Sequence, residues 1–342
     1  MSIRLPYPED NYRLFIFNPE TDYALASGSL AYNPPAVVKA LRRHLALLPA
    51  YMARERDAVV ILDSPRNEPD EELRSIVARK GIDIVALSDC ADYVAERMEK
   101  EGKAPIVTPW GWNHSLRKTL RSAGLAENLL IGKEALESFR NISHRRSTID
   151  FYRMLSERLD LSHIEIPREC NSTDEALGAC AENEISYLKA PWSSSGRGVV
   201  TTESLSPDRL KEWISGCIRR QGSVMVEKGY DRTGDFASEW WIENGNARFM
   251  GLSMFNTSKD GRYGGNVVIP DEEIERRIIS LSPQWSREII EAQKEALERL
   301  AGGKYAGPAG IDMITTKEGF IIPCVEINFR FTMGMVALFR RW

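Results

Sequence analysis

The first third of the chain alternates short apolar runs with segments whose apolar residues recur every three or four positions. The apolar runs predict β-strands over residues 13–18, 58–62, 82–87 and 105–108. The periodic segments predict helices over residues 36–48, 70–80, 92–100 and 113–122. Strands that alternate with helices of this length are typical of parallel βαβ units. We therefore predict an α/β fold with a doubly wound parallel sheet in an N-terminal domain, residues 1–132.

The rest of the chain shows a different order of elements. Helices are predicted over residues 133–161, 207–220, 283–300 and 333–342. Strands are predicted over residues 184–190, 199–202, 223–226, 236–243, 247–255, 309–315 and 320–327. Adjacent strands joined by short glycine-containing turns indicate hairpins, so the sheets here are antiparallel. This pattern predicts an α+β unit over residues 133–342.

Composition narrows the classes of function. With 342 residues, 43% of them hydrophobic and 27% charged, the chain is typical of a soluble globular protein with more than one domain. The formal net charge of -4 argues against nucleic acid as a partner. No apolar run approaches the roughly 20 residues that span a bilayer, so no membrane partner is expected. The five cysteines form no CxxC pair and the start resembles no signal peptide, so a cytoplasmic location is expected.

The last predicted hairpin carries an unusual set of polar side chains. Asp312 interrupts its first apolar strand, and Glu326, Asn328 and Arg330 alternate at the end of its second. Side chains two residues apart share one face of a strand, and the turn can bring Asp312 beside them. Two carboxylates and an amide oxygen suit Mg²⁺ that is held against phosphate groups. The alternative reading is a half-buried strand with a polar outer face.

A second candidate is the loop between the strands at residues 184–190 and 199–202. Lys189 lies at the end of the first strand, and the loop that follows is rich in serine and glycine. Its backbone N–H groups can point at phosphate oxygens, with a cation at the base. It is not a Walker A loop, because no helix follows, and no GxGxxG follows the first strand of the chain. The alternative reading is a serine-rich hairpin loop.

Two polar and aromatic segments, residues 18–23 and 108–113, follow strands of the N-terminal sheet. Open α/β sheets usually bind ligands at the carboxyl ends of their strands. Asn, Asp, Pro and Gly are also common in turns and helix caps, which is the alternative reading. Our hypothesis is that Glu20 and Trp110 help to form a pocket for an acceptor substrate.

Taken in order along the chain, these motifs resemble the ATP-grasp superfamily. Asp312 followed by a hairpin and Glu326-x-Asn328-x-Arg330 resembles its metal-binding end, and residues 189–199 (KAPWSSSGRGV) resemble its glycine-rich lid. The resemblance covers roughly residues 140–340, and it implies a unit with two lobes, residues 133–222 and 223–342. The N-terminal domain resembles the domain that usually precedes this unit.

The resemblance implies a role for each matching residue. Asp312, Glu326 and Asn328 would bind Mg²⁺, with Mn²⁺ as the alternative. The catalytic groups would be Lys189, Arg197 and Arg330, with Arg262 as a further candidate to hold the acyl phosphate. The residues that would bind ATP are Lys189, Ser193, Ser194, Ser195, Gly196, Gly198, Glu227, Lys228, Gly229, Tyr230, Glu239 and Arg145. Arg145 stands near the position where many relatives have a lysine, and an exposed charge at a helix start is its alternative reading. For Glu239 the alternative is a solvent-facing strand residue.

The function that the resemblance implies is an ATP- and Mg²⁺-dependent carboxylate–amine ligase. Such an enzyme activates a carboxylate as an acyl phosphate, forms a carbon–nitrogen bond and releases ADP, without a protein nucleophile. The substrates would be a small-molecule or peptide carboxylate and an amine, and homodimers are common among such enzymes. Two alternatives stay open, a small-molecule kinase and a nucleotide-binding module without catalysis.

Overall fold

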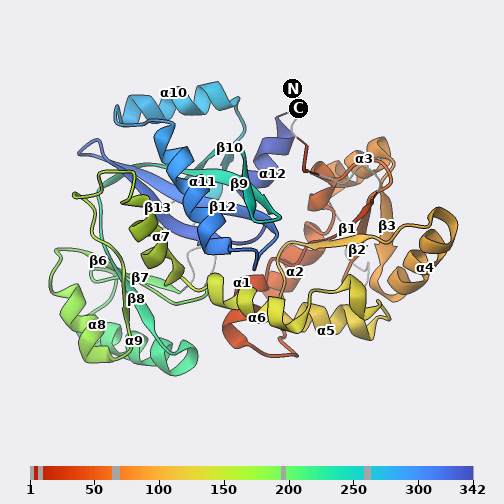
Figure 1. Ribbon diagram of the computed structural model, residues 1–342. Helices are drawn as coiled ribbons and strands as arrows, with labels where there is room; N and C mark the ends of the chain where they lie inside the picture. Colours follow the sequence, from red (N-terminus) through yellow and green to blue (C-terminus); the bar gives the residue numbers. More distant parts are fainter. Residues whose placement is uncertain (1–3, 7–10, 64–69, 194–197, 258–262, 342) are drawn as a thin grey trace. The chain divides into compact units, whose positions relative to one another are not determined.

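The computed structural model of the protein describes residues 4–6, 11–63, 70–193, 198–257 and 263–341. The chain forms two compact units, Met1–Glu137 and Ser138–Arg341, which are coloured from red to yellow and from yellow-green to blue in Figure 1. The predicted division of the second unit after residue 222 stays a prediction. Among the described residues, no helix combines the length and the apolar character needed to cross a membrane.

The first unit contains the predicted parallel sheet. Its strands are β1 Arg13–Ile16, β2 Ala58–Ile61, β3 Asp83–Ala86 and β4 Ile106–Pro109, in the order β3-β2-β1-β4. All three strand pairs are parallel, which confirms the α/β prediction. The helices are α1 Thr21–Ser27, α2 Ala36–His44, α3 Glu71–Lys80, α4 Cys90–Glu101 and α5 His114–Ser122. Three short 3-10 turns join them: η1 Leu48–Tyr51, η2 Leu87–Asp89 and η3 Glu127–Leu129.

Local sequence signals explain where some of these helices begin and end. The side chain of Asp70 caps the first turn of α3, and Gly81 ends the helix in the left-handed conformation. The predicted helix over residues 36–48 is too long, because α2 ends at His44. Its apolar stripe is also only partly buried, since Val37 and Leu41 are 59% and 45% exposed. Beyond Leu45, the residues Ala46, Leu47 and Leu48 are buried outside the helix, and Leu48 begins the separate turn η1.

The two segments of the candidate acceptor pocket meet at the carboxyl ends of β1 and β4. The Asn18 amide nitrogen donates to the Gly111 carbonyl oxygen at 2.7 Å, and Asn18 Oδ1 accepts from the Gly111 N–H. Trp110 is 5% exposed and packs edge-on against Phe17 with the ring centroids 5.0 Å apart. The Glu20 carboxylate is paired with Arg42. Trp110 is therefore a core residue, and a role for the two segments in substrate binding stays a prediction.

Helix α6 Lys133–Ile142 runs from the first unit into the second, which continues with helix α7 Ser147–Leu155 and a four-stranded antiparallel sheet. The strands are β5 Arg168–Cys170, β6 Ser186–Lys189, β7 Val199–Thr201 and β8 Val224–Lys228, in the order β5-β8-β6-β7. Helices α8 Thr173–Cys180 and α9 Pro207–Gln221 share an apolar core with this sheet. Strand β6, which carries Lys189, is therefore packed against helices through this shared core.

A five-stranded antiparallel sheet follows, in the order β11-β10-β9-β12-β13. Its strands are β9 Arg232–Glu243, β10 Asn246–Thr257, β11 Tyr263–Val267, β12 Gly307–Thr316 and β13 Ile321–Asn328. Its helices are α10 Asp271–Leu281, α11 Glu288–Ala301 and α12 Met333–Arg340. Consecutive strand residues point to opposite faces. Ser238 bonds to Gln293 of α11, whereas Glu239 bonds to Thr332 at the start of α12, so these two helices cover opposite faces (Figure 1).

Several elements of this unit differ from the prediction, and strands β5 and β11 were not predicted. The helix predicted over residues 283–300 begins later, as α11, and α10 and α8 are additional helices. Helix α8 has a signal that could have been found, because Ser172 caps it and the Glu175 side chain accepts from the Asn171 N–H. Pro270 and an acidic first turn likewise mark the start of α10.

Candidate active site

The hairpin of β12 and β13 brings the predicted oxygen donors together. Asp312 lies directly opposite Glu326, and Gly310 lies opposite Asn328, so the donors share one face of the sheet. The Asn328 amide nitrogen donates to Asp312 Oδ2 at 3.1 Å. Arg330 follows at the end of β13, where it donates to Asn328 Oδ1 at 2.8 Å. The structure thus groups the three donors and the arginine that the sequence pattern indicated.

The electrostatics of this group favour a divalent cation. Burial, together with the neighbouring Glu326 carboxylate, raises the pKa of Asp312 to about 8. Burial also opposes ionisation of Glu326, but Arg145 and Lys189 outweigh it and hold the pKa of Glu326 below its usual value. A cation between the two carboxylates would remove their repulsion, and oxygen donors are what Mg²⁺ prefers. The residues present therefore fit a Mg²⁺ ion.

Such an ion would need further ligands from outside the protein. Among the described residues, no three His, Cys, Asp or Glu side chains come together as a metal site. Two carboxylates and one amide oxygen fill only part of the octahedral shell of Mg²⁺, which usually keeps water and binds substrate phosphates. These donors therefore suit a metal ion whose coordination is completed by water and by a bound phosphate ligand.

Lys189 ends β6 beside this hairpin. Its Nζ atom lies 2.5 Å from Glu227 Oε2 and donates to the Val325 carbonyl oxygen at 3.1 Å. Val325 is the residue before Glu326, so the lysine lies next to the metal-binding face rather than far from it. The side chain is 7% exposed, which keeps its charge in an environment of low dielectric constant.

Arg145 connects the loop after β6 to the hairpin. Its guanidinium donates to the Ala190 carbonyl oxygen at 2.5 Å, to Ser193 Oγ at 2.8 Å and to Glu326 Oε1 at 2.7 Å. Arg145 is 6% exposed, so the alternative reading as an exposed charge at a helix start is wrong. Arg145 therefore contacts two parts of the site at once: the Glu326 carboxylate, which would bind the metal, and the base of the predicted lid.

The ends of the predicted lid are anchored to each other. The Ala190 N–H donates to the Gly198 carbonyl oxygen at 2.8 Å. Gly198 has a φ of 77°, and a Cβ atom there would come within 2.9 Å of the Ser193 Cβ. Glycine is therefore required at this end of the loop. Five of the predicted site residues lie outside the described part of the chain: Ser194, Ser195, Gly196, Arg197 and Arg262.

At the end of β8, Glu227 and Lys228 have one edge with which no strand of the described residues pairs. Strand β5 pairs with β8 from Val224 to Val226, whereas β6 also pairs with Glu227 and Lys228. Alternate residues of an antiparallel strand direct their N–H and C=O groups to opposite neighbours. One of Glu227 and Lys228 therefore presents both groups to the side that β5 does not cover. A planar base with a donor and an acceptor fits such an edge.

Solved structures share the fold of this chain, although no protein-family model and no curated protein sequence matches it. The biotin carboxylase–β,γ-ATP complex from Campylobacter jejuni matches 97% of this chain and 68% of that chain, with 10% identity and a TM-score of 0.54. The ADP complex of N5-carboxyaminoimidazole synthetase from Staphylococcus aureus matches 97% of this chain and 74% of that chain, with 12% identity and a TM-score of 0.50. The chain has the ATP-grasp fold.

Within this ATP-grasp fold, Glu239 lies in an unexpected environment. Its side chain is 1% exposed, so the reading as a solvent-facing strand residue is wrong. Thr332 Oγ1 donates to one carboxylate oxygen at 2.7 Å and Ser253 Oγ donates to the other at 2.9 Å. Burial raises the pKa of Glu239 to about 7. Both oxygens are therefore engaged by the protein.

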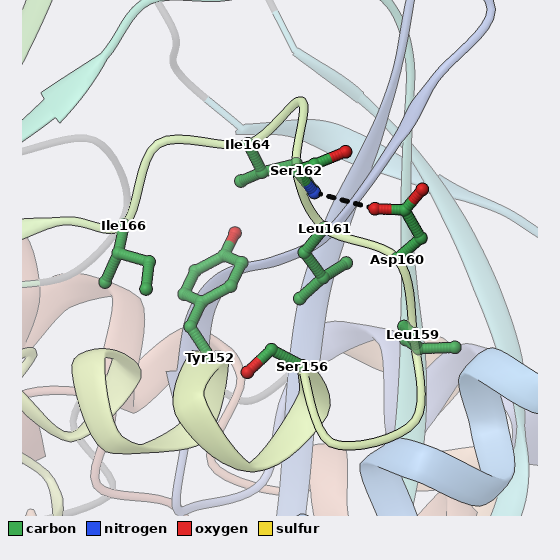
Figure 2. A pocket seen from close by; sticks show the side chains of 8 residues that line it. All are labelled: Tyr152, Ser156, Leu159, Asp160, Leu161, Ser162, Ile164 and Ile166. Carbon is green, nitrogen blue, oxygen red and sulfur yellow. Dashed lines mark hydrogen bonds between the residues drawn. The ribbon is translucent and has the colours of Figure 1, made fainter.

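A pocket of about 400 Å³ lies at the C-terminal end of α7 in this ATP-grasp fold (Figure 2). Figure 2 shows the Tyr152 ring between Ile166 on one side and Leu161 on the other. The residues that line the pocket are Tyr152, Ser156, Leu159, Asp160, Leu161, Ser162, Ile164 and Ile166. No residue predicted for the site lines it. Its link to the site is Tyr152, whose hydroxyl donates at 2.5 Å to the carbonyl oxygen of Cys324, two residues before Glu326.

His144, beside Arg145, is a residue whose state the sequence does not indicate. It is 3% exposed and packs edge-on against Trp192. Its Nε2 lies 3.5 Å from a Glu169 oxygen, an arrangement that could suit a charged ring. However, its Nδ1 accepts from the Arg146 N–H at 3.0 Å and so carries no proton. Burial, followed by the charges of Arg146, Arg140 and Arg145, lowers the pKa of His144 to about 3.

The neutral state of His144 predicts a dependence of stability on pH. Between pH 6.5 and pH 3 the unfolded chain binds a proton at this residue and the folded chain does not, so stability falls as the pH falls. From pH 7 to pH 5 the loss should be about 2 kcal/mol. Urea unfolding of the wild type and of His144→Asn, which keeps an acceptor for the Arg146 N–H, measures it. The wild type should lose about 2 kcal/mol more than the variant over this range, and equal losses in the two proteins would show that His144 titrates normally.

Proposed function

We propose that the protein is an ATP- and Mg²⁺-dependent carboxylate–amine ligase that releases ADP. The observation that carries the proposal is the convergence of Asp312, Glu326 and Asn328 with two buried cations, Lys189 and Arg145. The solved structures that share the fold support it, because one is described as a complex with β,γ-ATP and the other as a complex with ADP.

Asp312, Glu326 and Asn328 would hold the metal. When bound there, Mg²⁺ would neutralise the charge that develops on the β- and γ-phosphates. The three side chains are already placed on one face by the strand register. Little ordering would remain for binding, which favours affinity.

Lys189 and Arg145 would bind the phosphate groups. Both are buried, and charge–charge interactions are stronger in such an environment than in water. Arg145 also contacts Ser193, at the start of the lid, so phosphate binding would reach the loop that covers it. The backbone N–H groups of residues 193–198 would complete the cover, and the uncovered edge at Glu227 and Lys228 would bind the base.

The reaction would have two steps, phosphoryl transfer to the carboxylate and then attack by the amine. A carboxylate oxygen of the substrate attacks the γ-phosphorus of ATP, the bond to the bridging oxygen breaks, and ADP leaves. The nitrogen of the amine then attacks the carbonyl carbon of the acyl phosphate, loses a proton and displaces inorganic phosphate. Arg330 and Arg197 would bind the anionic acyl phosphate, because arginine pairs well with both carboxylate and phosphate.

The test is a survey of products with ATP and Mg²⁺. The protein is incubated with amino acids, dipeptides and small organic acids, each with and without an added amine, and ADP and inorganic phosphate are measured. A ligase should produce both in equal amounts when the carboxylate and the amine are present together, and little phosphate when either is missing. ADP with a stable phosphorylated product would indicate a kinase. A rise in melting temperature with Mg-ATP but no ADP from any mixture would indicate a binding module.

A further inference from the structure

Glu239 occupies the same face of the sheet as the metal-binding donors. The register places Glu239 opposite Gly310, and Gly310 opposite Asn328, so the three form one row across β9, β12 and β13. The next row contains Asp312 and Glu326. On this face an unpartnered carboxylate would point at any ligand of the site. What the side chain actually contacts decides whether it can be a ligand.

The start of α12 covers Glu239 completely. Thr332, the N-cap of α12, donates to the carboxylate and accepts from the Met335 N–H at 2.9 Å. A Cβ atom at Gly334 would lie only 1.9 Å from Glu239 Oε1 and 2.3 Å from Ser253 Oγ. Any larger residue at this position would collide with the carboxylate. The helix start therefore rests directly on Glu239, whose two oxygens accept from the hydroxyls of Thr332 and Ser253.

This contact fixes the short segment that carries Arg330. The segment is held at one end by the pairing of Asn328 with Gly310, and at the other by Thr332 on Glu239. Between these points Arg330 bonds to the Asn328 side chain and, at 3.1 Å, to the carbonyl oxygen of Phe331. If Thr332 were released, Arg330 and the amide of Asn328 would lose their fixed orientation.

We propose that Glu239 is a positioning residue, which anchors the start of α12 through Thr332 and so orients Asn328 and Arg330 toward the metal and the phosphates. It does not itself bind the cofactor, unlike the role expected from its sequence position. The part of the inference that names the metal and the phosphates rests on the proposed function. The anchoring of the segment does not, because it is a property of the fold. The two parts can therefore be tested separately.

The experiment compares three substitutions of buried threonines. Thr332→Val removes the hydroxyl and keeps the shape, and Thr332→Ser keeps the hydroxyl. Thr315→Val is the matched control, because Thr315 is a fully buried residue of β12 whose hydroxyl bonds to Thr233. Amide hydrogen exchange of residues 328–336 is measured without ligand. Binding of the β,γ-imido analogue of ATP with Mg²⁺ is measured by calorimetry.

Thr332→Val should raise the exchange rate of residues 328–336 about tenfold and weaken binding of the analogue about tenfold. Thr332→Ser and Thr315→Val should resemble the wild type in both measurements. If the wild type binds the analogue and Thr332→Val binds it equally well, the positioning role is wrong while the proposed function stands. If the wild type does not bind it, the proposed function fails. In that case only amide hydrogen exchange tests the anchoring of the segment, and an unchanged exchange rate of residues 328–336 in Thr332→Val overturns it.

Discussion

Glu326→Gln should lower ATP turnover by about 100-fold or more while the protein stays folded. The substitution keeps the size of the side chain but removes the charge that would bind the metal opposite Asp312. It also removes the partner of Arg145 in the 2.7 Å ion pair. Both effects should act on turnover, and the first should raise the Mg²⁺ concentration that is needed for half-maximal rate. Steady-state ADP formation over a series of Mg²⁺ concentrations measures this.

The matched control is Glu318→Gln. Glu318 is an exposed carboxylate in the turn of the same hairpin, so its loss changes the net charge equally but not the site. Asp312→Asn should act like Glu326→Gln, although Arg145 keeps its partner in that variant. Turnover at the wild-type level in both Glu326→Gln and Asp312→Asn would rule out the metal-binding assignment.

Arg145→Met should have the second largest effect, and it should act on stability as well as on activity. Glu326 would lose its buried partner, and breaking a buried ion pair from one side typically costs about 3–5 kcal/mol. The carbonyl oxygen of Ala190 and the hydroxyl of Ser193 would also lose a donor. Urea unfolding without nucleotide measures the loss of stability, and binding of the ATP analogue measures the loss of affinity.

Arg146→Met separates these effects from a general loss of positive charge. The Arg146 side chain is 48% exposed, and its nearest carboxylate is Glu169 at 3.8 Å. Exposed pairs of this kind contribute about 0–1 kcal/mol, so this variant should be nearly as stable as the wild type. Equal stabilities of Arg145→Met and Arg146→Met would show that the buried pair does not hold the site together.

The sequence predicted the parts of the site that depend on local order. Alternation along one strand places Glu326 and Asn328 on one face, and a short turn returns the chain to Asp312, so the hairpin could be predicted and is confirmed. The parallel sheet was predictable for a similar reason, because strands and helices alternate regularly in the first unit. In each case the pattern lies within a few tens of residues.

Contacts between distant parts of the chain could not be predicted in this way. Arg145 and Glu326 are separated by 181 positions, and no periodicity relates them. The helix-start pattern around Arg145 suits an exposed charge equally well, and only packing decides between the two. The sequence around Glu239 is also ambiguous, because its strand pattern fits a side chain that faces solvent. The start of α12, 93 positions later, buries it.

The pairing of Arg145 with Glu326 has a consequence for the order in which ligands enter. A triphosphate that bound Arg145 alone would take from Glu326 its partner at 2.7 Å, and a cation that bound Glu326 alone would take from the buried guanidinium its carboxylate. Arrival of both together would give the guanidinium and the carboxylate each a partner of opposite charge. The proposed site would therefore favour a preformed complex of the two over either component alone.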